Sequence, residues 1–142
     1  SNVKFGTLTG SEAGLTNAVN NALADAGMTI DDIDAVFGFA NGMKAVDDVE
    51  IKGLTAVFGD KLAEKPVVEL KEVLGESRAA AATTAAAHAA LMFAGKIPSQ
   101  EAYSIAADGS VSKTNVEASK LNNVLVVAYG AGGSYTAIVL SK

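Results

Sequence analysis

The sequence predicts an α/β fold in which helices pack against a mixed five-stranded sheet. Segments with helical periodicity alternate along the chain with short apolar runs that are typical of buried strands. Hydrophobic residues make up 49% of the sequence and charged residues 19%, which favours a packed core over disorder. The length of 142 residues suits a single domain that buries most of its unfolded surface.

The N-terminal third begins with a short expected strand, residues 3–8, followed by a helix. Ser11 is a suitable N-cap for a helix from Glu12 to Ala26, and Gly27 is placed to end it. The 3.6-residue period puts the following side chains on one face, which we expect to be the core face: Leu15, Val19, Ala22, Leu23 and Ala26.

The middle of the chain predicts a strand, a helix and a second strand. Residues 35–39 form a buried-strand candidate that leads into the loop 40–43, at the end of a strand where α/β folds usually place their sites. A helix is expected from Asp47 to Val57, ended by Gly59, and a short strand over 66–70. Four side chains of that helix segment are expected to point inward: Val49, Leu54, Val57 and Phe58.

The segment from Ser77 to Ala94 consists mostly of Ala, Ser and Thr and carries almost no charge, which predicts a buried helix with closely packed neighbours. Gly95 and Pro98 end it. Residues 99–121 allow two edge strands around the turn Asp108-Gly109. Segments 124–129 and 135–140, separated by a glycine-rich turn, predict an antiparallel hairpin.

Composition excludes several classes of function. The chain has no Cys, so it has no disulfide, no zinc-cysteine site and no thiol nucleophile. The net charge of -5 argues against a nucleic-acid partner, and no apolar run approaches the roughly 20 residues of a membrane span. We expect a cytoplasmic protein without a cofactor or metal site. Ser1-Asn2 is interpreted as a cloning remnant, which leaves residues 3–142 as one domain.

A series of short motifs occurs in a characteristic order. It comprises Ala24-Asp25-Ala26-Gly27-Met28, Asp31-Asp32-Ile33-Asp34, Ala40-Asn41-Gly42 with Asp47 and Glu50, Val57-Phe58-Gly59, Pro66-Val67, Lys71-x-x-Leu74-Gly75-Glu76, Ile97-Pro98 and Tyr129-Gly130-Ala131-Gly132-Gly133-Ser134. This order resembles the C-terminal half of β-ketoacyl-acyl carrier protein synthases, which are thiolase-like condensing enzymes. The resemblance covers residues 3–142 and is weakest between 99 and 121. It implies a thiolase-like half.

The resemblance also implies site positions. Asn41 and Glu76 stand where the family has the two His that bind the thioester oxygen and promote decarboxylation of the malonyl unit. Lys71 stands at the family's Lys, which orders the neighbouring loop. Ala131 replaces the aromatic residue that gates the acyl pocket, and Gly132 and Gly133 follow it as candidates for substrate contact.

These positions depart from the family's chemistry. An Asn donates a hydrogen bond to an oxyanion but does not shuttle protons near neutral pH, and a carboxylate at position 76 repels the developing enolate. The family takes its nucleophilic Cys from the N-terminal half, and this chain has none. We therefore expect no activity from the chain alone.

Each position also has a simpler interpretation. Lys71 beside Glu69, Glu72 and Glu76 fits a surface ion pair, and Asn41-Gly42 is a common turn sequence. The glycines at 130, 132 and 133 join two strands and open no helix, which argues against a nucleotide-binding loop. His88 lies inside the Ala-rich helix, where a satisfied core histidine is favoured over a ligand.

Two functional hypotheses follow from the resemblance. The chain is the C-terminal half of a condensing enzyme of fatty-acid or polyketide synthesis, or it is a non-catalytic subunit, like a chain-length factor, that pairs with an active synthase. A free-standing binding module is less favoured, because half of a two-part site would stay open. The expected partners are an N-terminal synthase half or a partner subunit, and an acyl carrier protein reached through the parent protein. The oligomeric state stays open.

Overall fold

The computed structural model describes residues 11–75, 81–130 and 132–142, and the strand expected over 3–8 lies outside them. Within these ranges a single mixed sheet has the strand order β4-β3-β2-β1-β5-β6. The strands are β1 (Ala35–Phe37), β2 (Val67–Val68), β3 (Ser99–Ile105), β4 (Val111–Glu117), β5 (Asn123–Gly130) and β6 (Ser134–Ser141). The longer helices are α1 (Glu12–Ala26), α2 (Lys44–Phe58) and α4 (Ala81–Phe93).

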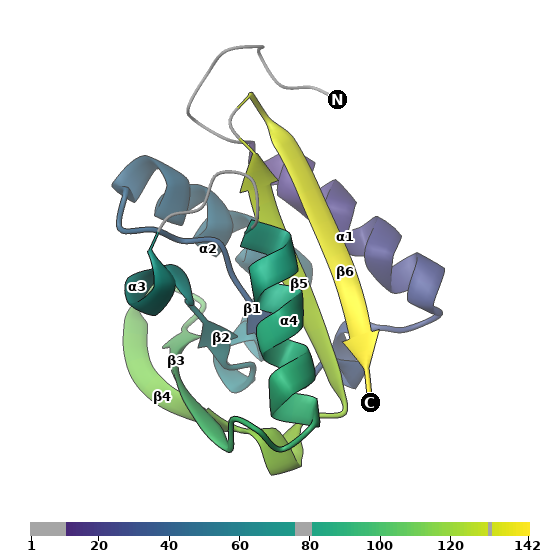
Figure 1. Cartoon of the computed structure of the whole chain (residues 1–142). Helices are drawn as coiled ribbons and strands as arrows, with labels where there is room; N and C mark the ends of the chain where they lie inside the picture. The colour runs from purple at the N-terminus through teal and green to yellow at the C-terminus, as the bar shows by residue number, and fades with distance from the viewer. Residues whose placement is uncertain (1–10, 76–80, 131) are drawn as a thin grey trace.

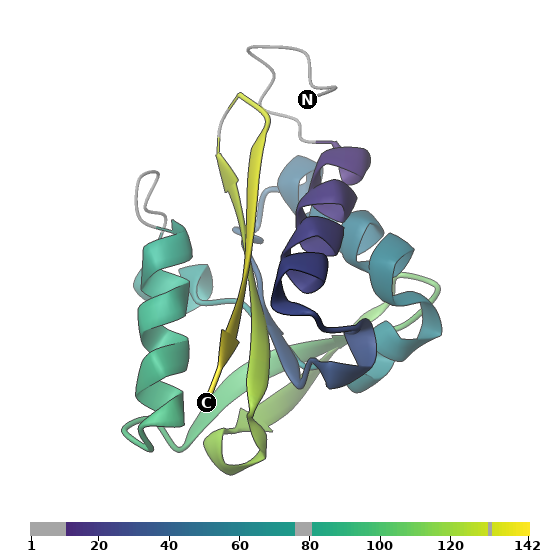
Figure 2. The same ribbon diagram turned by 90° about the vertical axis from the view of Figure 1, so that its right-hand side faces the viewer.

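Figure 2 shows the layers of the molecule. Helices α1 and α2 cover one face of the sheet, and α4 lies on the opposite face. The short helix α3 (Lys71–Leu74) follows β2, and three 3-10 helices complete the described elements, at Ile30–Asp32, Gly59–Glu64 and Ala118–Lys120. Strand β1 is buried at every residue because helices cover both of its faces.

The α/β class is confirmed, but the strand count differs from the expectation. The described sheet has six strands instead of five, because both segments between 99 and 117 join it as a regular antiparallel hairpin. Of these two strands only β4 lies at an edge of the sheet, since β3 also pairs with β2. Gly109 turns this hairpin with a φ of 81°, a conformation that favours glycine.

Helix α1 has the predicted ends. The Ser11 side chain accepts a hydrogen bond from the backbone N–H of Gly14 at 3.2 Å, and Gly27 ends the helix in the left-handed conformation. Leu15, Val19 and Leu23 are buried as expected, whereas Ala22 is half-buried and Ala26 is exposed.

Helix α2 begins three residues earlier than expected and ends at Phe58, just before Gly59. Its buried residues are Val46, Glu50, Gly53, Leu54 and Phe58. Val49 and Val57, which we expected in the core, are only half-buried, because the face that meets the sheet is rotated toward Glu50. A carboxylate therefore occupies a position that the sequence pattern assigns to an apolar side chain.

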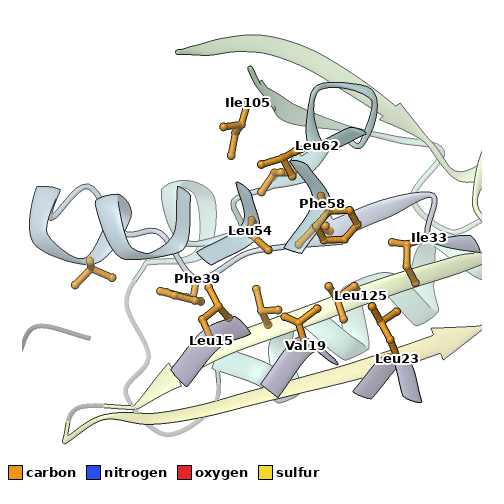
Figure 3. Packing of buried hydrophobic residues seen from close by; sticks show 14 residues of the cluster. Leu15, Val19, Leu23, Ile33, Phe39, Leu54, Phe58, Leu62, Ile105 and Leu125 are labelled. Carbon is orange, nitrogen blue, oxygen red and sulfur yellow. The ribbon is translucent and has the colours of Figure 1, made fainter. Parts of the chain in front are cut away.

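The main core lies between the helices α1 and α2 and the sheet. Figure 3 shows Leu15, Val19 and Leu23 of α1 facing Leu54 and Phe58 of α2 across Leu125 of β5. Gly53 allows this close approach, since a Cβ on it would lie 2.6 Å from a methyl carbon of Leu15. A second core, between the sheet and α4, is formed by Phe37, Val68, Ala85, Ala89, Met92 and Val126 among others.

The expectation of a buried Ala-rich helix is only half correct. Residues 77–80 of the predicted span lie outside the described residues, and α4 runs over Ala81–Phe93. Ala85, Ala89 and Met92 are buried against the sheet, but Ala87, Ala90 and Leu91 on the outer side are exposed. In the part of the chain that the structure describes, α4 is covered from one side only (Figure 2).

Candidate functional site

Three strand ends meet at one edge of the sheet. Strand β1 runs parallel to both β2 and β5, so the three carboxyl ends lie at the same edge. The loop 38–43 leaves β1 there, α3 follows β2, and the turn after Gly130 follows β5 (Figure 1). This is the edge at which α/β sheets usually place a site.

Asn41, Lys71, Gly132 and Gly133 lie in the segments that follow these three strands, at one edge of the sheet. Glu76 and Ala131, the other two expected site positions, lie outside the described residues. The roles of all these residues stay predictions.

Asn41 lies in a tight turn between β1 and α2. Its backbone N–H donates to Oδ1 of Asp47 at 2.9 Å, and its own Oδ1 accepts from the backbone N–H of Met43 at 3.1 Å. Gly42 has a φ of 82°. These are the features of an Asx turn, so the simple interpretation of Asn41-Gly42 describes its local structure correctly.

Lys71 begins α3 and is half-buried. It lines a cavity of about 100 Å³ on the α4 side of the sheet, together with Gly38, Leu70, Leu74, Gly75, Thr84 and Ala85. Its charge lowers the pKa of Glu69, against the larger effects that raise it. Glu69, one of the acidic residues considered as its ion-pair partner, is half-buried, and its Oε2 atom is fully buried.

A second cavity, of about 220 Å³, opens on the α2 side of the same edge. Ala40 and Gly42, the neighbours of Asn41, line it together with Asp47, Glu50, Ile51, Val67, Glu69, Tyr103, Ile105 and Val111. Lys71 therefore borders the cavity on the α4 side of the sheet, and the backbone around Asn41 borders the cavity on the α2 side.

The carboxyl group of Glu50 organises the loop after β1. Glu50 is 2% exposed, and its two oxygens accept hydrogen bonds from the backbone N–H groups of Phe39 at 2.6 Å and Ala40 at 2.9 Å. It also shares a side-chain hydrogen bond with Glu69. Burial raises the pKa of Glu50, although the hydrogen bonds from Glu69, Phe39 and Ala40 oppose this effect.

Glu69 is the partner that sequence reasoning missed. Burial, followed by the charge of Glu50, holds the pKa of Glu69 well above its ordinary value of 4.5. The signal available in the sequence was an acidic residue directly after the two buried valines of β2, opposite a second acidic residue on the core-facing side of α2.

His88 lies on α4 and packs its ring against Phe37, with ring centroids 6.1 Å apart. Burial lowers the pKa of His88, and a hydrogen bond with Gln100 opposes this. The packing agrees with a core histidine, although its Nε2 is buried without a hydrogen-bond partner among the described residues. The described residues hold no group of three or more His, Cys, Asp or Glu side chains placed to bind a metal ion.

Three aromatic rings pack together at this edge of the sheet. Phe39, Tyr129 and Tyr135 form an aromatic cluster whose centroids are 5.4 to 6.4 Å apart. It supports the loop after β1 and the turn between β5 and β6 from the α1 side.

Among the helices that the structure describes, none is long and apolar enough to cross a membrane.

Comparison with solved structures shows the same fold in "The ishigamide ketosynthase/chain length factor". The match has a TM-score of 0.76 and 24% sequence identity, and it covers 94% of this chain and 34% of the other chain.

Curated relatives carry the name "Putative polyketide beta-ketoacyl synthase 2". The protein of Streptomyces coelicolor is 31% identical over 134 residues, and that of Streptomyces halstedii 29% over 134 residues; each match covers 93% of this chain and 32% of the relative. The chain thus spans about a third of the length of these relatives.

Residues 3–104 match the family described as "Beta-ketoacyl synthase, C-terminal domain". This match covers well over half of the chain. The chain belongs to the β-ketoacyl synthase C-terminal domain family.

Proposed function

We propose that the chain is the C-terminal domain of a β-ketoacyl synthase-like protein of fatty-acid or polyketide biosynthesis, and that it has no acyl-transfer activity by itself. The observation that carries the proposal is the absence of Cys from a chain of this family, since condensation requires a nucleophile that holds the acyl group as a thioester. Asn41 and Glu76 at the positions of the family's two His support it.

The apolar surface around α4 supports a second synthase half as the partner. Three large hydrophobic side chains are exposed there: Leu74 at 59%, Leu91 at 47% and Ile138 at 38%. Ile138 lies on this side because it pairs across strands with Val126, which packs in the α4 core. We call Leu74, Ala87, Ala90, Leu91 and Ile138 the α4 surface.

A helix that faces water normally carries charged residues on its outer side. Helix α4 has no Asp, Glu, Lys or Arg between Ala81 and Phe93. Such a surface favours coverage by another protein layer. The fold match supports a second synthase half as that layer, because this chain covers only 34% of the similar solved chain.

A non-catalytic subunit that resembles a chain-length factor is the second candidate. Asn41 and Glu76 favour it, since neither residue type supplies the imidazole chemistry of a condensing enzyme. Both candidates place the nucleophile on another polypeptide segment. Contact with an acyl carrier protein is expected through that segment, because this chain has a net charge of -5 and the carrier protein is itself acidic in this family.

Intact-protein mass spectrometry tests the proposal. We expect no added mass after the chain is incubated with an acyl thioester such as hexanoyl-carrier protein. A β-ketoacyl synthase known to form the adduct serves as the positive control. A stable acyl adduct on this chain would refute the proposal and locate its nucleophile.

A further inference from the structure

The carboxyl groups of Glu50 and Glu69 meet in the interior beside Gly38. A Cβ on Gly38 would lie 2.8 Å from Oε1 of Glu50 and would overlap Oε1 of Glu69. Glu50 lies on α2 and Glu69 directly follows β2, so residues nineteen positions apart converge on the backbone of Gly38, the residue that follows β1. The absence of a side chain at position 38 gives them the space to do so.

The hydrogen bonds of Glu50 and Glu69 indicate which of the two carboxyl groups carries a proton. Glu50 accepts from the backbone N–H groups of Phe39 and Ala40 through both of its oxygens, as an ionised carboxylate does. Glu69 Oε2 is buried without a hydrogen-bond partner among the described residues, so Oε1 is the oxygen that meets Glu50. Two carboxyl groups hydrogen-bond to each other only when one of them carries a proton.

We propose that Glu69 is a positioning residue whose protonated carboxyl group donates to Glu50, and that this shared proton holds the loop 38–42 in the conformation of the structure. The proton sits on Oε1 of Glu69, and Glu50 keeps its negative charge for the two backbone N–H groups. The inference concerns the conformation of the loop that carries Asn41 and does not rest on the proposed function.

The surroundings favour one negative charge over two. Asp47 on α2 adds a further negative charge, and it also accepts from the backbone N–H of Asn41. Lys71 on α3 favours ionisation of Glu69, but its effect is the smallest of those that act on this group. Tyr103 on β3 lines the same cavity, and Lys113, its cross-strand neighbour on β4, forms an ion pair with Glu101 at an exposed position.

Loss of the proton places two carboxylates against each other in a site with little water. Like charges at such a distance cannot both persist without movement. The side chain of Glu69 has the neighbouring cavity of about 220 Å³ into which it can turn. Glu50 then loses one of its three hydrogen-bond donors, and the loop that it holds loosens.

Nuclear magnetic resonance of the 142-residue chain tests the inference. The readouts are the side-chain carboxyl ¹³C shifts of Glu50 and Glu69 and the backbone amide shifts of Phe39 and Ala40, followed from acid to alkaline pH. We expect all four signals to share a midpoint well above the ordinary value of 4.5.

Two variants separate positioning from a general effect of charge. Glu69→Gln keeps a hydrogen-bond donor toward Glu50 but cannot titrate, so the amides of Phe39 and Ala40 should stay at their acid-form shifts over the whole range. Glu64→Gln is the matched control, because Glu64 is an exposed glutamate in the connection between α2 and β2, on the other side of β2 from Glu69 in the sequence. It should leave the midpoint unchanged.

Carboxyl midpoints near 4.5 in the wild-type chain would overturn the inference, and so would an amide titration that persists in Glu69→Gln. Should that variant fail to fold, the carboxyl shifts of the wild-type chain decide alone, since a Glu69 that stays protonated well above pH 4.5 is visible there directly. A midpoint shared by both carboxyl groups and both amides supports it.

Discussion

The ring of Tyr135 packs directly on the backbone of Gly14. A Cβ on Gly14 would lie 2.7 Å from two carbons of that ring, and the Tyr135 hydroxyl accepts a hydrogen bond from the backbone N–H of Ser11. The contact joins the first turn of α1 to the start of β6, just after the glycine turn of the candidate edge. A residue near one end of the chain thereby fixes a strand near the other end.

Gly14→Ala is expected to lower the free energy of unfolding by about 1–3 kcal/mol, the usual cost of forcing extra atoms into a packed contact. Without the clash, the same change inside a helix would stabilise the chain by roughly 0.5–1 kcal/mol. Urea denaturation measures the difference. Gly130→Ala is the control, since its Cβ would make ordinary contact at 3.5 Å with Ser134 and should change stability little. A stabilised Gly14→Ala variant would show that the Tyr135 contact is absent.

Gly38→Ala is expected to disturb the carboxyl pair. Its methyl group would occupy the space between Glu50 and Glu69, and buried polar groups that lose their partners cost about 1–3 kcal/mol each. We expect lower stability together with shifted amide resonances of Phe39 and Ala40. Unchanged stability and unchanged resonances would argue that the two carboxyl groups lie farther from Gly38 than in this structure.

Glu69→Gln should change how stability depends on pH. The pKa of Glu69 is raised in the folded chain, so between 4.5 and that raised pKa the folded state binds more protons than the unfolded state. The free energy of unfolding of the wild-type chain therefore falls as pH rises through this window, by at most about 1.4 kcal/mol per pH unit for one proton. Below pH 4.5 this contribution to stability is fully present.

The Glu69→Gln variant has no ionisable group at position 69, so its free energy of unfolding should fall less than that of the wild-type chain over the same pH range. Denaturation at pH 4 and pH 8 compares the two chains: we expect similar stability at the lower pH and a more stable variant at the higher pH. Glu64→Gln should follow the wild-type chain at both. A variant that is less stable than wild type at pH 8 would contradict a protonated Glu69.

Exposed apolar side chains promote association of an isolated domain with itself, and Leu91→Glu is expected to reduce this, because Leu91 is 47% exposed on the outer side of α4. A new charge there opposes burial against a second molecule, and the folded domain should keep its stability within about 0.5 kcal/mol, as for other surface changes. Sedimentation velocity over a range of concentrations measures the effect. Met43→Glu is the control, since Met43 is 50% exposed at the start of α2, outside the α4 surface. Equal effects of both changes would speak against α4 as the interface.

Local signals in the sequence predicted much of the fold. The ends of α1 were predictable because Ser11 and Gly27 act on the backbone next to them. The hairpin of β5 and β6 was predictable because its strands adjoin in sequence and are separated by glycines, two of which have positive φ. Asn41, Lys71 and Gly132 share one edge of the sheet because the parallel strands that precede them end there together.

The remainder depended on contacts between distant residues. Burial of Glu69 requires Glu50 of another element and the bare backbone of Gly38, a combination that no periodicity reveals. The exposure of α4 was mispredicted for a related reason: composition shows that a helix is apolar, but not which of its sides pack within the chain. The strands β3 and β4 appeared weak in sequence because most of β4 is exposed and lacks a clear apolar pattern.

Release of labelled carbon dioxide from malonyl-carrier protein is the most direct measurement of the proposed lack of activity. We expect the unmodified chain to release no more than buffer. The double variant Asn41→His with Glu76→His should form no condensation product either, because two imidazoles stabilise an enolate but hold no acyl chain. A β-ketoacyl synthase active in the same assay is the positive control. Release by the unmodified chain above the buffer rate would contradict the proposal and require chemistry from residues other than Cys and His at the family's positions.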